Sequence, residues 1–77
     1  MPTRAFILIE AQVGKVQRVV VALRSLAGIS SADIITGRFD VIALVEVADM
    51  GAMADLVTGR VQGIRGVLRT ITCVVAG

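Results

Sequence analysis

Apolar residues follow two different periods along this chain, and the period changes several times. Residues 3–11, TRAFILIEA, form a short apolar run rich in β-branched and aromatic side chains between Pro2 and Gly14, which predicts a strand. After Gly14, apolar residues recur at steps of three and four, which predicts an amphipathic helix over residues 13–26 that ends at Gly28. The apolar stripe of this helix is predicted to be Val13, Val16, Val20, Leu23 and Ala27.

The second half of the chain repeats this change of period. Residues 29–36 predict a second, more polar strand and residues 39–48 a third, joined by a tight connection at residues 37–38 that is typical of a hairpin. Asp49 is the expected N-cap of a second helix, and residues 67–76, VLRTITCVVA, predict a fourth strand. The second helix is predicted to bury Met50, Met53, Val57 and Val61 and to end at Gly63 and Gly66.

The resulting order, strand-helix-strand-strand-helix-strand, has an internal symmetry. Glu10 and Glu46 each leave a strand just before a helix, and each helix is followed by a similar short segment, LAGI in one half and IRGV in the other. This is the arrangement of the split β-α-β unit. The predicted fold class is therefore α+β, a ferredoxin-like βαββαβ fold in which one four-stranded antiparallel sheet carries two helices on one face.

The predicted strands are too apolar for a sheet with one solvated face. Residues 41–45, VIALV, lack the alternation of apolar and polar residues expected of such a sheet, and the first and last strands are also apolar at most positions. Two helices cover only one face, so the other face must pack on something else. A second copy related by a two-fold axis is the simplest cover, and burial of about 800 Å² per partner would fit an ordinary interface.

Composition supports oligomerisation and excludes several other classes. The 77 residues form one predicted domain, and one cysteine and no histidine allow neither an internal disulfide nor a Cys/His zinc site. Hydrophobic residues make up 56% of the chain, yet its longest charge-free runs have eight residues, too short for a membrane span. At the N-terminus only five apolar residues stand between Arg4 and Glu10, too few for a signal peptide. We expect a cytoplasmic protein. The net charge is +2, but the basic residues are scattered singly in sequence, which predicts no nucleic-acid patch.

Groups that perform catalysis are scarce. The chain has no His, Tyr or Trp and only one Lys, so no enzyme and no cofactor are predicted. Cys73 lies in an apolar strand and is expected to be a buried small hydrophobe. Glu10 and Glu46 occupy matching positions, which leaves open a shared acid pair or two solvated strand ends.

The segment TGRFD, residues 36–40, is the strongest candidate for a binding site. Gly37 can supply the positive φ of a hairpin while Asp40 caps free N–H groups, which would be a structural role. The same turn can bind a zwitterion, with backbone N–H groups for its carboxylate and Asp40 for its ammonium group. Thr70 and Thr72 alternate on the last strand, so their hydroxyl groups point to one face together.

The turn TGRFD, its spacing to VTGRVQGIRGV and the strand RTITCVV together resemble the effector domain of the leucine-responsive regulatory protein/AsnC (Lrp/AsnC) family, also called the RAM domain. The motifs are a T-G-x-[FY]-D turn and a G-V-x-x-[ST]-x-T strand, and the likeness runs from Phe6 to Val75. The resemblance implies a dimeric α/β barrel made of two facing sheets, with dimers joined into a ring such as an octamer or decamer.

The resemblance also implies a small amino-acid effector, bound between dimers by the turn and the last strand. Four turn residues and both strand threonines match the motifs, whereas Arg38 stands at a variable position and its role stays open. The candidate ligand-binding residues are Thr36, Gly37, Arg38, Phe39, Asp40, Thr70 and Thr72.

Family regulators carry a helix-turn-helix DNA reader ahead of this domain, whereas here the first predicted strand begins at Thr3. We therefore expect a stand-alone effector module without direct DNA binding. A regulatory role would require assembly with a full-length Lrp/AsnC regulator, or sensing of the ligand by another route. Two alternatives remain. One is a small dimeric α/β-barrel enzyme, an isomerase or monooxygenase-like protein using Glu10 or Glu46. The other is a ligand-free oligomeric subunit in which the Gly37 turn is only a hairpin.

Overall fold

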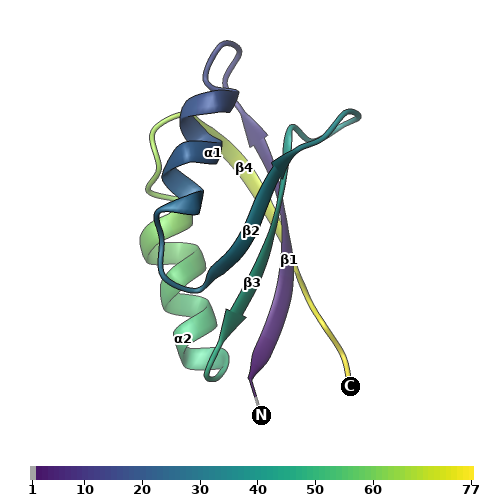
Figure 1. Cartoon of the computed structure of the whole chain (residues 1–77), viewed down its shortest axis with the longest axis vertical. Helices are drawn as coiled ribbons and strands as arrows, with labels where there is room; N and C mark the ends of the chain where they lie inside the picture. Colours follow the sequence, from purple (N-terminus) through teal and green to yellow (C-terminus); the bar gives the residue numbers. More distant parts are fainter. Residues whose placement is uncertain (1) are drawn as a thin grey trace.

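The computed structural model describes residues 2–77 and confirms the predicted βαββαβ order. The strands form one antiparallel sheet in the order β2-β3-β1-β4, and both helical segments lie on one side of it (Figure 1). This is the ferredoxin-like arrangement. The elements are β1 (Thr3–Ala11), α1 (Val16–Arg24), β2 (Ile29–Ile34), β3 (Val41–Val47), α2 (Met50–Ala54), η1 (Asp55–Val61) and β4 (Val67–Val74).

The central strand β1 shows how the sheet divides the molecule. Ile7 pairs with Ala43 on β3 and with Thr72 on β4, and this row faces the helices. Side chains directly opposite one another in a sheet share a face, so the adjacent row, centred on Leu8, faces away from the helices. The core lies between sheet and helices. Its buried strand residues are Ala5, Ile7, Ile9, Ala11, Ala32, Val41, Ala43 and Val45.

Helix α1 is shorter than the sequence predicts. Gly14 has a φ of +83°, and Lys15 is the N-cap, so the helix begins at Val16 and leaves Val13 fully exposed. A residue in the left-handed region ends helical geometry, and the tight turn here excludes Val13 from the apolar stripe. Ala27 is also exposed. The predicted stripe is therefore wrong at both ends, and the buried residues of the helix are Val19, Val20 and Leu23.

The second helical segment begins as predicted and then changes type. The Asp49 carboxylate accepts the Ala52 N–H at 2.8 Å, which confirms the N-cap. From Asp55 to Val61 the helix is a π-helix, and the Gln62 N–H donates to the Val57 oxygen at 3.0 Å. A π-helix has i→i+5 hydrogen bonds and a wider turn than an α-helix, which keeps residues four apart on one face. The buried side chains are Met53, Leu56, Val57 and Val61, while Met50 is exposed, contrary to prediction.

The connection between β2 and β3 is longer than the predicted two-residue hairpin. The strands end at Ile34 and begin again at Val41, and the Ile35 N–H donates to the Asp40 oxygen at 2.9 Å to close the loop. Gly37 has a φ of +128°, so the glycine is required at this turn. The predicted two-residue connection was wrong because residues 35–36 and 39–40, the adjoining ends of the two predicted strands, belong to the loop. The last strand likewise stops at Val74 rather than at residue 76.

The sheet face opposite the helices, which we call the open face, is apolar and partly exposed. Phe6 is 40% exposed and Ile71 is 44% exposed, and the cross-strand pairs place both side chains on this face. Cys73 pairs with Phe6 on the same face and is exposed in the chain, which contradicts its expected burial. Leu8, Ile42 and Leu44 complete the face and are half-buried. Among residues 2–77, no helix is long and apolar enough to cross a membrane.

Candidate functional site

The loop of residues 35–40 is fastened to the end of the central strand through Asp40. Its carboxylate Oδ2 accepts the Ala11 N–H at 2.8 Å, and its own N–H donates to the Ile9 oxygen at 2.9 Å. Asp40 Oδ1 has no hydrogen-bond partner among residues 2–77. A half-buried carboxylate held in this way keeps one oxygen for a second donor. The structure thus gives Asp40 a structural contact and leaves its other oxygen able to accept.

The remaining turn residues differ in exposure. Thr36, Gly37 and Arg38 are exposed at the loop tip, whereas Phe39 is half-buried. The guanidinium of Arg69 lies over the Phe39 ring, 5.8 Å from its centre, and the Arg69 Nε is 3.9 Å from Glu10 Oε1. Arg69 joins the turn to β4 by a cation–π contact. Arg69 is not recognisable as a neighbour of the turn from the sequence, because only the register of β1 against β4 places it beside Glu10.

Thr70 and Thr72 face the other side of the sheet from Arg69. They pair with Ile9 and Ile7, whose side chains are buried under the helices. The Gln62 amide donates to Thr70 Oγ1 at 3.3 Å, which ties the threonine to the end of η1. The two hydroxyl groups do share a face. Within one chain, however, the sheet separates this face from the Phe39–Arg69 contact.

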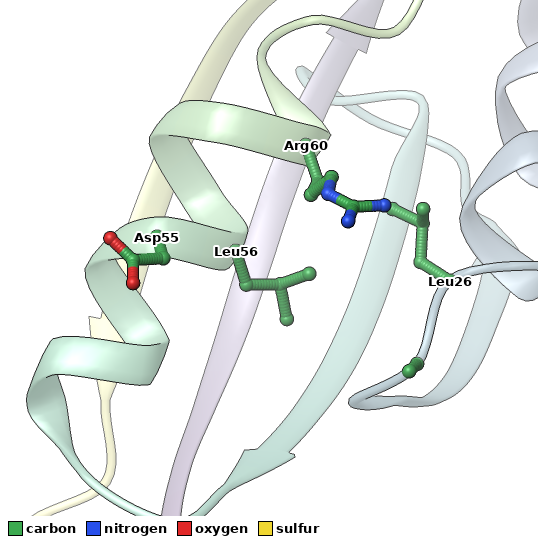
Figure 2. Close-up of a pocket in the computed structure, with 5 residues that line it drawn as sticks. Leu26, Asp55, Leu56 and Arg60 are labelled. Carbon is green, nitrogen blue, oxygen red and sulfur yellow. The ribbon is translucent and has the colours of Figure 1, made fainter.

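Hollows in the surface lie beside both helical segments and β4. One of about 400 Å³ is lined by Gln62, Thr70 and the first residues of β4. Another, of about 210 Å³, lies between the end of α1 and η1, where Arg60 reaches toward Leu26 and Asp55 points away (Figure 2). The first of these hollows includes a predicted site residue.

The carboxylates Glu10 and Glu46 do not form the acid pair that one alternative requires. Glu10 lies opposite Arg69 at one end of β1, and Glu46 lies opposite Arg4 at the other end. Arg4 and Glu10 are six residue steps apart on β1, which is about 20 Å at the usual rise per residue. Residues 2–77 also contain no group of three His, Cys, Asp or Glu side chains that could hold a metal ion. Within one chain, Glu10 and Glu46 therefore cannot act on one ligand as a shared acid pair.

The family model described as "Lrp/AsnC ligand binding domain" matches residues 4–76. The chain belongs to this Lrp/AsnC ligand-binding domain family. The match covers the whole folded unit, from the first strand to the residues after β4. The family is one of regulatory ligand-binding domains rather than of enzymes.

Several solved structures are similar to this Lrp/AsnC domain. TTHA0845 from Thermus thermophilus is 31% identical, with a TM-score of 0.93, and the match covers 97% of this chain and 94% of that one. AsnC from E. coli is 21% identical (TM-score 0.91, coverage 97% and 51%). The regulator NMB0573 from Neisseria meningitidis, solved as an L-Met complex, is 22% identical (TM-score 0.85, coverage 97% and 50%). The last two likenesses show the fold, and the chain spans about half of each regulator. A comparison with curated protein sequences finds no match.

Proposed function

We propose that this Lrp/AsnC domain binds a free amino acid at the turn of residues 36–40. The observation that carries the proposal is the fixed position of Asp40, whose Oδ2 is held by Ala11 while Oδ1 has no partner among residues 2–77. An ammonium group is a strong donor to such an oxygen. The L-Met complex of NMB0573 supports an amino acid as the class of ligand.

The loop tip supplies the second half of the proposed site. Gly37 and Arg38 are exposed, and their N–H groups make no backbone hydrogen bond among residues 2–77. These donors suit the carboxylate of a zwitterion, and the Arg38 side chain can add its charge. The turn therefore offers opposite charges for the two ends of one small ligand.

The threonines of β4 enter this proposal through a neighbouring copy. Within one chain Thr70 and Thr72 face the helices, away from the Phe39–Arg69 contact. In a ring of dimers, the edge of β4 from one dimer could approach the turn of the next dimer and supply hydroxyl groups there. Dimers themselves would form when two open faces pack together into an α/β barrel. A ligand held between dimers would stabilise the ring, since it favours the state to which it binds better.

Asp40→Asn is the decisive variant for the binding site. Asparagine keeps an oxygen for the Ala11 N–H but loses the charge that holds the ammonium group, so amino-acid affinity should fall at least about tenfold with little change in stability. A calorimetric titration with each of the twenty amino acids identifies the ligand first and then compares the variant. Asp40→Ala should abolish binding and leave the dimer intact.

Equal amino-acid affinity in the parent and in Asp40→Asn would show that the ligand binds elsewhere on the protein. The bond from Asp40 to Ala11 also favours a second candidate, a ligand-free oligomeric subunit in which Asp40 only fastens the loop. For that candidate, no amino acid would raise the melting temperature or change the size of the assembly. Thermal unfolding and light scattering over the same ligand set separate the two.

A further inference from the structure

Three basic side chains, two from the start of α1 and one from a segment distant in sequence, surround one hollow near the start of α1. The hollow has a volume of about 270 Å³ and is lined by Gln12, Lys15, Arg18, Arg65 and Gly66. Its residues come from the β1–α1 loop, the first turn of α1 and the connection from η1 to β4, which lie side by side in Figure 1. Lys15 and Arg18 lie within one helical turn of each other, and the fold brings Arg65 to them from a distant part of the sequence.

Backbone contacts hold the two loops together. The Gln12 N–H donates to the Gly66 oxygen at 2.7 Å, and the Lys15 N–H donates to the Gln12 oxygen at 2.9 Å. Gly66 has a φ of +98°, and a Cβ atom there would lie 2.9 Å from the Lys15 Cβ and 3.3 Å from a Val19 methyl group. Only glycine lets the loop approach α1 so closely. This approach places Arg65 beside Lys15.

The charge of the hollow is not balanced within the chain. Lys15, Arg18 and Arg65 are exposed and take part in no ion pair among residues 2–77. No carboxylate lines the hollow: Asp40, at the same end of the sheet, is not among its lining residues. Like charges held together repel one another, and a bound anion relieves that repulsion.

The first turn of α1 adds to the positive electrostatic potential of the hollow. Its N-cap, Lys15, makes no side-chain hydrogen bond, and the turn contains no acidic residue. The unsatisfied N–H groups at a helix start carry partial positive charge, which is usually offset by a capping side chain or an acid. Here three basic side chains lie at the start of the helix in place of an acid, which increases the preference of the hollow for an anion.

We propose that this hollow binds a multivalent phosphate anion, either inorganic pyrophosphate or the diphosphate group of a larger metabolite. Two guanidinium groups can each bind phosphate oxygens in a bidentate manner, and three positive charges suit a diphosphate better than a single carboxylate. No aromatic side chain lines the hollow, so phosphate rather than a base would be recognised. The proposal is independent of amino-acid binding at residues 36–40.

Calorimetric titration of the intact protein with inorganic pyrophosphate tests the proposal. We expect saturable binding of one anion per chain that weakens as the salt concentration rises. Arg65→Gln and Arg18→Gln should each weaken it at least about tenfold, since each removes a charge-assisted contact. Arg60→Gln is the matched control, because it removes the same charge from an exposed side chain on η1 that lines a different hollow, and it should change affinity less than about twofold.

Additional ligands and variants distinguish the sources of the anion. ADP binding as tightly as pyrophosphate, or more tightly, with the same loss in Arg65→Gln, would support the site and indicate a nucleotide diphosphate. Pyrophosphate binding without ADP binding would support the site for the free anion. Circular dichroism verifies that the variants fold, and Lys15→Gln gives a third independent substitution.

Three outcomes would overturn the proposal. One is the absence of saturable pyrophosphate and ADP binding. Another is an equal loss in Arg60→Gln and Arg65→Gln, which would show a general effect of surface charge. A short DNA duplex that binds while pyrophosphate does not would also reject the small-anion site and would identify this surface as a nucleic-acid contact.

Discussion

Two aspartates act on the backbone of this domain over very different distances in sequence. Asp49 accepts the N–H of Ala52, three residues ahead, and Asp40 accepts the N–H of Ala11, which lies 29 positions away. The first contact fixes the start of a helix, and the second fixes a loop to the central strand. Only the first is visible as a local pattern, since an N-cap and the N–H it accepts lie within one turn.

Substitution of Asp49 tests the local contact. Asp49→Ala should lower the free energy of unfolding by about 1 kcal/mol, because the Ala52 N–H loses its acceptor. Asp49→Asn keeps a carbonyl oxygen at the same place and should change stability by only a few tenths of a kcal/mol. Urea unfolding of the parent and both variants measures the difference. A loss of the same size in both variants would mean that the charge, rather than the hydrogen bond, stabilises the helix start.

At the scale of elements, glycines decide where segments end and how closely they approach. Gly66 has a positive φ and faces Lys15 and Val19. Gly59 lies within η1 without a positive φ, and a Cβ atom added there would meet no other atom within 4 Å. Position 66 therefore requires a glycine, whereas position 59 does not. Gly66 permits a close approach of a loop to a helix, and Gly59 only adds flexibility to the unfolded chain.

Alanine at these two positions should therefore have opposite effects. Gly66→Ala should destabilise the domain by about 1–3 kcal/mol, through backbone strain and displacement of Lys15. Gly59→Ala should stabilise it by about 0.5–1 kcal/mol. Thermal and urea unfolding compare the pair directly. Destabilisation by Gly59→Ala would indicate that the π-helical turn itself needs a glycine at this position.

The whole molecule has one covered and one uncovered side of its sheet. Helices cover the side of Ile7, and the open face exposes Phe6, Ile71 and Cys73 without any cover from residues 2–77. Exposed apolar area of this kind favours association between copies. The outer surface of α1 has only an isolated apolar residue by comparison, Val21, which is 64% exposed.

A charge on the open face tests whether this face joins two copies. If the open face joins two copies, Ile71→Lys should raise the dissociation constant of that dimer at least about tenfold, because a symmetric interface buries the new charge twice. Val21→Lys makes the same chemical change on α1 and should leave the association unchanged. Sedimentation equilibrium of the three proteins gives the constants. A dimer that survives Ile71→Lys but dissociates in Val21→Lys would place the interface on the helical side.

The sequence by itself determined the order of elements, the two-sided apolar character of the strands and the N-cap at Asp49. These depend on periodicity and on contacts within a few residues, which the sequence displays directly. Turn residues 36–40 were also recognisable as a candidate site, because their chemistry is local. The exclusion of Val13 from the apolar face of α1 was not recognisable from the sequence, since it depends on the left-handed turn that Gly14 adopts in the folded chain.

Tertiary structure alone decided which distant residues meet. Strand register places Arg69 beside Glu10, separates Glu10 from Glu46 and turns Thr70 toward the helices. The packing of the η1–β4 loop against α1 also brings Arg65 to Lys15, through the close approach at Gly66. A shift of register by one residue would turn Arg69 and Thr70 to the opposite faces of the sheet, although their local sequence would be unchanged. Such contacts depend on the packing of the whole sheet against its helices, and short-range patterns do not encode that packing.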